Sequence, residues 1–125
     1  VIASGRMETV RKFIEISAKK LNWNKGNKDV SIIWEGTGLN EIGRRADTGE
    51  IVIRIDPRYF RPTEVNELLG DPTKAHKDLG WFPKINLEEL ISEMIVFDCE
   101  EVKKEIILKE SGMIIKSDFE LPPNY

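Results

Sequence analysis

The chain is constrained most by residues 55–64, where a strand pattern runs directly into a turn fixed by proline. Pro62 locks its own φ and pushes Arg61 toward an extended conformation, which suits the start of a short helix. Residues three apart share a face in such a turn, so Arg61 and Glu64 are predicted to point the same way. The sequence therefore predicts a guanidinium beside a carboxylate at the end of a strand.

This pair of charges has two interpretations. A guanidinium offers planar donors that match phosphate oxygens bidentately, and an adjacent carboxylate accepts both hydroxyls of a ribose diol. Arg61 and Glu64 would then grip a nucleoside diphosphate together. The alternative is an ion pair on a solvated turn, which contributes only about 0.2–0.5 kcal/mol. Spacing alone leaves both open, because short motifs occur often by chance.

The remaining patterns predict an α/β chain, a small mixed α+β domain of about three short strands and three to four helices. Branched, alternating segments predict strands, the first of them a strand end, at residues 1–3, 30–34 and 50–55. Apolar periodicity predicts helices at residues 9–21, 72–79 and from 86 onward. Thr9 is the predicted N-cap of the first, and Asn86 with Glu89 forms a capping box for the last. Residues 39–49 are polar and predict an exposed loop or hairpin arm.

The short helix at 72–79 has readable ends. Asp71 is its predicted N-cap, Pro72 its first helical residue, and Gly80 follows its last turn. Ala75 and Leu79 are the apolar residues predicted to pack.

Composition excludes several classes of function. The 125 residues carry a net charge of −3 with both signs interspersed, so no basic stripe for nucleic acid is present. The single Cys99 cannot form an intramolecular disulfide, and the single His76 argues against the common zinc and iron sites. No apolar run approaches the ~18 residues of a membrane span. We expect a cytoplasmic protein with no membrane partner.

One domain is expected at residues 1–109, followed by an irregular tail at 110–125 that contains Gly112, Pro122 and Pro123. The chain lacks an initiating methionine and opens on an apolar run, as if cut inside a larger sheet. We see no internal repeat and no second domain.

Three runs of residues are similar to those of one known family. They are Asp56-Pro57-Arg58-Tyr59-Phe60-Arg61-Pro62-Thr63-Glu64-Val65, Leu68-Leu69-Gly70-Asp71-Pro72-Thr73-Lys74-Ala75 and Leu79-Gly80-Trp81. Together they resemble the C-terminal part of the GDP-mannose 4,6-dehydratase family, a branch of the extended short-chain dehydrogenase/reductases (extended SDR). The likeness begins at residues 1–5, continues through the helix after residue 86, and fades after about residue 109.

The resemblance implies the substrate-binding domain of an enzyme that converts GDP-D-mannose into GDP-4-keto-6-deoxy-D-mannose and water with bound NADP. It implies that Arg61 binds the diphosphate and Glu64 the guanosine ribose. Arg11 lies in a first helical turn near the substrate-facing loop, where it would support the diphosphate. Its alternative is an ordinary solvated charge. Tyr59 would line a base or sugar pocket, or else anchor the core.

The same resemblance identifies parts that are missing. Family members hold NADP with a glycine-rich turn and react through a Tyr-x-x-x-Lys pair. Tyr59 has Thr63 four residues on, and Gly36 and Gly38 do not make Gly-x-Gly-x-x-Gly. We therefore expect a fragment without the Rossmann nucleotide-binding half, inactive alone. Its expected partners are GDP-mannose and the N-terminal nucleotide-binding domain of the same enzyme, a homo-oligomer in the family.

Two other functions fit the residues. A UDP-sugar epimerase or dTDP-sugar dehydratase also uses an Arg-Pro-x-acid run, although the lead-in at residues 58–60 favours GDP. A stand-alone nucleotide-binding or interaction module also fits, because the sequence lacks the Gly-x-Gly-x-x-Gly and Tyr-x-x-x-Lys motifs of the enzymes.

Overall fold

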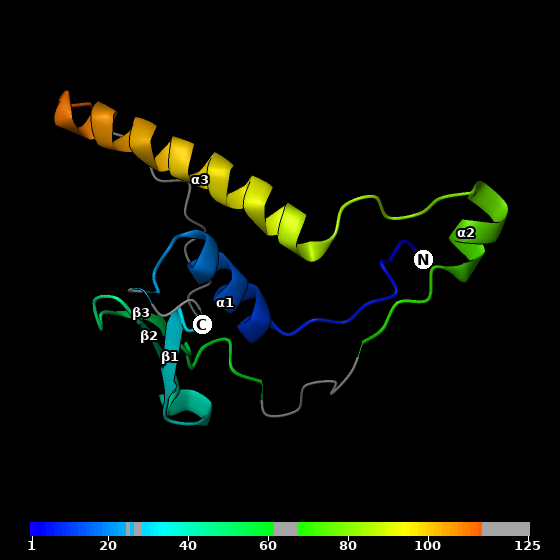
Figure 1. Ribbon diagram of the computed structural model, residues 1–125, viewed down its shortest axis with the longest axis horizontal. Helices are drawn as coiled ribbons and strands as arrows, with labels where there is room; N and C mark the ends of the chain where they lie inside the picture. The colour runs from blue at the N-terminus through cyan, green and yellow to red at the C-terminus, as the bar shows by residue number, and fades with distance from the viewer. Residues whose placement is uncertain (25, 27–28, 62–67, 114–125) are drawn as a thin grey trace.

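The computed structural model describes residues 1–24, 26, 29–61 and 68–113 (Figure 1). The helices are α1 (Val10–Lys20), α2 (Thr73–Leu79) and α3 (Leu87–Glu110), with a short 3-10 helix η1 (Gly38–Asn40). The strands are β1 (Ile32–Glu35), β2 (Ile42–Arg45) and β3 (Ile51–Arg54). The described residues form the small mixed α+β fold that the sequence predicts.

The strands form one antiparallel sheet in the order β1-β2-β3. Glu35 pairs with Ile42, and Ile42 pairs with Arg54, so these three residues mark one end of the sheet, here called the Glu35 end. Gly43 in β2 is buried, and a Cβ there would lie 2.8 Å from Ile53 Cδ1. The centre of the sheet therefore has room only for glycine.

One prediction about strands was right in part and one was wrong. Residues 39–49, predicted as an exposed loop or hairpin arm, contain β2, which pairs antiparallel with β1 and β3 and is thus a hairpin arm rather than a loop. The sequence left loop and hairpin arm open because Arg44 and Arg45 interrupt the apolar alternation expected of a strand. In the fold these arginines pair with Glu35 and Asp47. Residues 1–3 form no strand, since no strand among the described residues pairs with them.

The sheet, α1 and α3 lie in successive layers, with α1 in the middle (Figure 1). Thr9 caps α1 as predicted, accepting a hydrogen bond from the Lys12 amide at 3.1 Å. The core of the layered body is thin, with one buried hydrophobic residue from each layer: Ala18 of α1, Ile32 of β1 and Ile91 of α3. Each contact between layers therefore carries a large share of the stability. The fourth buried hydrophobic residue among those described is Ala75 of α2, as predicted.

The helix α3 begins as the sequence predicts. Asn86 Oδ1 accepts from the Glu89 amide at 2.9 Å, and Glu89 Oε2 accepts from the Asn86 amide at 2.9 Å. This reciprocal capping box satisfies two of the orphan amides at the helix start. The helix ends at Glu110, and residues 114–125 of the predicted tail lie outside the described residues.

The helix α2 and the irregular segments on either side of it, residues 68–72 and 80–86, form an arm that extends away from the layered body (Figure 1). The helix starts one residue later than predicted, although Asp71 Oδ1 still accepts from the Thr73 amide at 2.9 Å. Gly80 ends it with φ +61°. Leu79, predicted to pack, is 74% exposed, and His76 packs instead, its ring centroid 4.4 Å from that of Phe82. The predicted packing of Leu79 was wrong because the arm offers that side no neighbour among the described residues.

Two features are absent from the described residues. No helix there is long and apolar enough to cross a membrane. No group of three or more His, Cys, Asp or Glu side chains there could hold a metal ion.

Candidate functional site

The turn that follows β3 leads the chain to the predicted ligand residues. The Tyr59 amide donates to the Asp56 carbonyl at 3.1 Å, with Pro57 between them. The Asp56 carboxylate accepts from the Arg58 amide at 3.0 Å and forms an ion pair with the Arg58 guanidinium at 2.6 Å. These bonds to Arg58 hold the pKa of Asp56 below its usual value. The turn is thus tied together by its own side chains.

Arg61 lies two residues beyond this turn and is exposed. It forms no ion pair or side-chain hydrogen bond with another described residue. Five other arginines are paired with carboxylates, namely Arg6, Arg11, Arg44, Arg45 and Arg58. Within the described part of the chain, the donors of Arg61 are therefore open to a ligand. Glu64 lies outside the described residues, so its placement beside Arg61 stays a prediction.

Tyr59 is 61% exposed and does not anchor the core of the described residues. The Arg58 guanidinium carbon lies 5.7 Å from the centroid of its ring. Of the two interpretations left open, exposure is compatible with lining a base or sugar pocket, and this role stays a prediction.

Arg11, the weaker candidate, is engaged on the sheet side of α1. Its guanidinium forms an ion pair with Glu41, and its Cζ lies 4.2 Å above the centroid of the Trp34 ring. The indole Nε1 of Trp34 donates to Glu15 at 2.9 Å. The first turn of α1 is thereby fixed to the Glu35 end of the sheet, and direct contact of Arg11 with a ligand stays a prediction.

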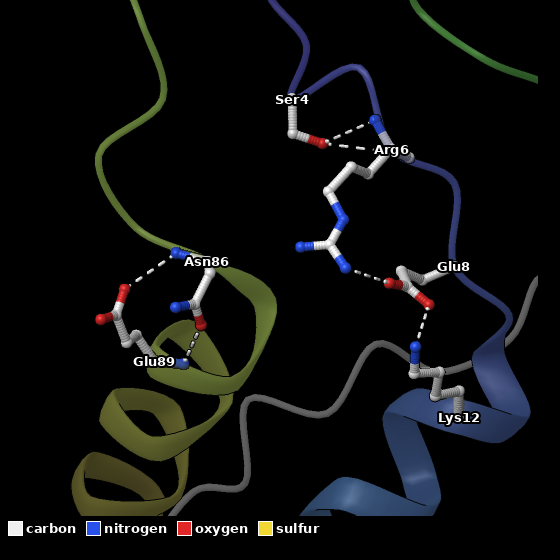
Figure 2. A network of polar contacts seen from close by, with 6 residues as sticks. All are labelled: Ser4, Arg6, Glu8, Lys12, Asn86 and Glu89. Atoms are coloured by element: carbon white, nitrogen blue, oxygen red, sulfur yellow. Dashed lines mark hydrogen bonds and ion pairs between the residues drawn. The ribbon is translucent and has the colours of Figure 1, made fainter.

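A cleft that the sequence did not predict lies between the segment before α1 and the start of α3. It has a volume of about 550 Å³, and its lining includes Ser4, Arg6, Glu8, Pro83, Lys84, Ile85, Asn86 and Glu89. Figure 2 shows that Glu8, in one wall of the cleft, joins two cations, Arg6 at 3.4 Å and Lys12 of α1 at 2.7 Å. The hydrogen bond from Lys12 holds the pKa of Glu8 below its usual value. Residues 4–8 carry no periodic signal, so only their placement reveals the cleft.

Comparison with known proteins identifies the family. Residues 1–94 match the family described as GDP-mannose 4,6 dehydratase. The chain belongs to the GDP-mannose 4,6-dehydratase family. A GDP-mannose 4,6-dehydratase of Yersinia enterocolitica is 39% identical over 96% of this chain and 33% of that relative. The Drosophila melanogaster protein of the same name is 42% identical over 86% of this chain and 25% of its own length.

The human GDP-mannose 4,6 dehydratase is 41% identical over 80% of this chain and 25% of that relative. The chain thus spans about a third or less of the length of the curated dehydratases that it matches. Its residues do not fit the NADP that the family implies, since the 125 residues contain neither Gly-x-Gly-x-x-Gly nor Tyr-x-x-x-Lys.

Proposed function

We propose that this chain is the substrate-binding part of a GDP-mannose 4,6-dehydratase whose NADP is held elsewhere in the same enzyme. The observation that carries the proposal is the family match over residues 1–94, within which Arg61 stands exposed with no described partner. Arg61 also lies on an exposed segment beyond the turn that follows β3, where a ligand can reach it.

In this proposal Arg61 binds the diphosphate of GDP-mannose and Glu64 binds the guanosine ribose. Neither residue moves a proton in the reaction. Their effect is to hold the nucleotide still, so that the hexose stays aligned for the chemistry performed by the rest of the enzyme. Arg61 suits this role because a guanidinium matches two phosphate oxygens at once.

The ordered turn before Arg61 supports this role. The Asp56–Arg58 ion pair gives Arg58 a partner within the chain, whereas Arg61 has none among the described residues. The exposed ring of Tyr59 offers a stacking surface beside it for the base or sugar. In this proposal Arg11 supports the diphosphate site indirectly, from the first turn of α1.

The rest of the enzyme is the expected partner. Large apolar side chains are exposed along the arm and the segment beside it, including Val1, Ile2, Leu68, Leu69 and Phe82. Exposed apolar surface of this kind marks an interface. We propose that the nucleotide-binding domain of the same enzyme covers it, in a cytoplasmic homo-oligomer that serves nucleotide-sugar metabolism on the way to GDP-fucose.

The test is Arg61→Ala in the intact enzyme that carries this chain, with Arg54→Ala as its control. Arg54 is also exposed and has no ion pair with a described residue, but it lies within β3. Losing a charged hydrogen bond to phosphate costs about 1.5–3 kcal/mol, so KM for GDP-mannose should rise about tenfold to a hundredfold. NADP binding should not change, and Arg54→Ala should leave KM unaltered.

An unchanged KM in Arg61→Ala would remove Arg61 from the site. Assays with GDP, UDP and dTDP sugars should show turnover with the GDP sugar alone. The 125-residue chain should bind GDP-mannose without converting it. Turnover by this chain with added NADP would show that the chemistry lies within it.

A further inference from the structure

The contacts of Arg11 join two parts of the chain that are far apart in sequence. Arg11 lies in the first turn of α1, and its partner Glu41 is 30 residues away, directly before β2. The register places Glu41 next to Ile42 at the Glu35 end of the sheet. Strand β3 ends at Arg54, at the same Glu35 end of the sheet, and the chain continues from there to Arg61. One ion pair thus links α1 to the sheet end from which Arg61 departs.

The loop that presents Glu41 is tightly built. Gly36 has φ +78°, and a Cβ on it would collide with the carbonyl oxygen of Asn40. The amide of Asn40 donates to the Thr37 carbonyl at 3.2 Å, and the amide of Glu41 donates to the Gly38 carbonyl at 3.1 Å. The carboxylate of Glu41 is therefore held by a compact backbone rather than by a loose loop.

Trp34 fixes the guanidinium from its other side. Its ring face lies under Arg11, and its Nε1 is held by Glu15 one helical turn further along α1. A guanidinium stacked on an indole and paired with a carboxylate has little rotational freedom left. The same first turn carries Lys12, whose bond to Glu8 continues into the wall of the cleft (Figure 2).

We propose that Glu41 and Trp34 are positioning residues for substrate binding. They hold Arg11 and, through it, the first turn of α1 and the segment before it at a set place against the sheet end that leads to Arg61. The inference rests on the proposed function, because it names what keeps that site in shape. Pre-organised groups bind more tightly, since less conformational freedom is lost on binding.

The test is Glu41→Gln in the intact enzyme. The amide keeps the shape of the side chain and removes its charge. KM for GDP-mannose should rise about fivefold, a size typical of coupling between contacting residues, while kcat and Tm stay unchanged. In an Arg11→Ala background, Glu41→Gln should add nothing, because the pair is already broken.

Glu35→Gln is the matched control. Glu35 pairs with Arg44 at 3.0 Å at the same end of the sheet, but that pair joins β1 to β2 and does not reach α1. It should leave KM unchanged. Trp34→Phe keeps a ring face for Arg11 and loses only the bond to Glu15, so its effect should be smaller than that of Glu41→Gln.

The exchanged variant Arg11→Glu/Glu41→Arg keeps the ion pair with its charges reversed but loses the stacking on Trp34. A KM closer to normal than that of Arg11→Ala supports positioning, also where Glu41→Gln fails to fold. A KM in a folded exchanged variant that is no better than that of Arg11→Ala would overturn the proposal, because the ion pair would then contribute nothing to binding. An unchanged KM in Glu41→Gln, with a raised KM in Arg61→Ala, would show a purely structural pair. An unchanged KM in Arg61→Ala would instead overturn the proposed function.

Discussion

The two faces of α1 are held in different ways. On the sheet side the contacts are directional, with an ion pair from Arg11, its stacking on Trp34 and the indole bond to Glu15. On the other side α1 packs against α3, and the groove between them is lined mostly by apolar side chains, among them Phe13 and Ile91. Ile91 is completely buried there, whereas the residues of the polar contacts stay partly exposed.

This difference separates stability from geometry. Burial of apolar surface is the larger source of free energy, but it is not directional and tolerates small shifts. Partly exposed ion pairs contribute little to the free energy of unfolding, although a stacked and hydrogen-bonded guanidinium fixes an angle. The α3 side should therefore keep α1 folded, while the sheet side sets where its first turn lies.

Ile91→Ala should have the largest effect on stability. Removing a fully buried isoleucine leaves a cavity between α3 and α1, and such changes destabilise by about 2–5 kcal/mol. Urea denaturation followed by circular dichroism measures the change. Ile107→Ala on the same helix is the control, because Ile107 is 64% exposed and its loss should stay within about 0.5 kcal/mol. Equal effects of the two variants would show that α3 is not held through Ile91.

Gly36→Ala should come next and tests the sheet side. Alanine at φ +78° is strained, and its Cβ would also meet the Asn40 carbonyl, so we expect a loss of about 2–3 kcal/mol. Gly38→Ala lies in the same loop at φ +57° with open space around it, so only the backbone strain of about 1 kcal/mol remains. Thermal unfolding of both variants isolates the collision. Identical losses would mean that the loop is less tightly built than the structure shows.

Asp47→Asn should have the smallest effect on stability, present above pH 3.8 and absent in acid. Hydrogen bonds from Arg45 hold the pKa of Asp47 below its ordinary 3.8. The folded state is therefore favoured above pH 3.8, and this contribution is lost as pH falls through the lowered pKa. In the variant the free energy of unfolding should therefore depend less on pH below about 3.8, as measured by urea titration at several pH values.

Asp78→Asn is the comparison for this pH dependence of stability. Asp78 is exposed on α2 and takes part in no ion pair with a described residue. Its replacement should leave this dependence as it was. A pH dependence for Asp47→Asn that matches that of the unaltered chain would show that the Arg45 pair does not persist in solution.

Signals that act within one helical turn were predictable from the sequence. Thr9, the Asn86–Glu89 capping box and Gly80 stand where their patterns put them, because each satisfies backbone groups a few residues away. The family was predictable as well, since the runs around Arg61 and Lys74 are specific in order and spacing, and the match over residues 1–94 confirmed it.

Only the tertiary structure decided which residues at long range meet. It gave β2 its place at the centre of the sheet, and it paired Arg11 with Glu41 across 30 residues. It also left Arg61 without a partner among the described residues while it paired five other arginines. Periodicity records what a residue does within its own element, whereas the partner of a charge depends on how separate elements pack together.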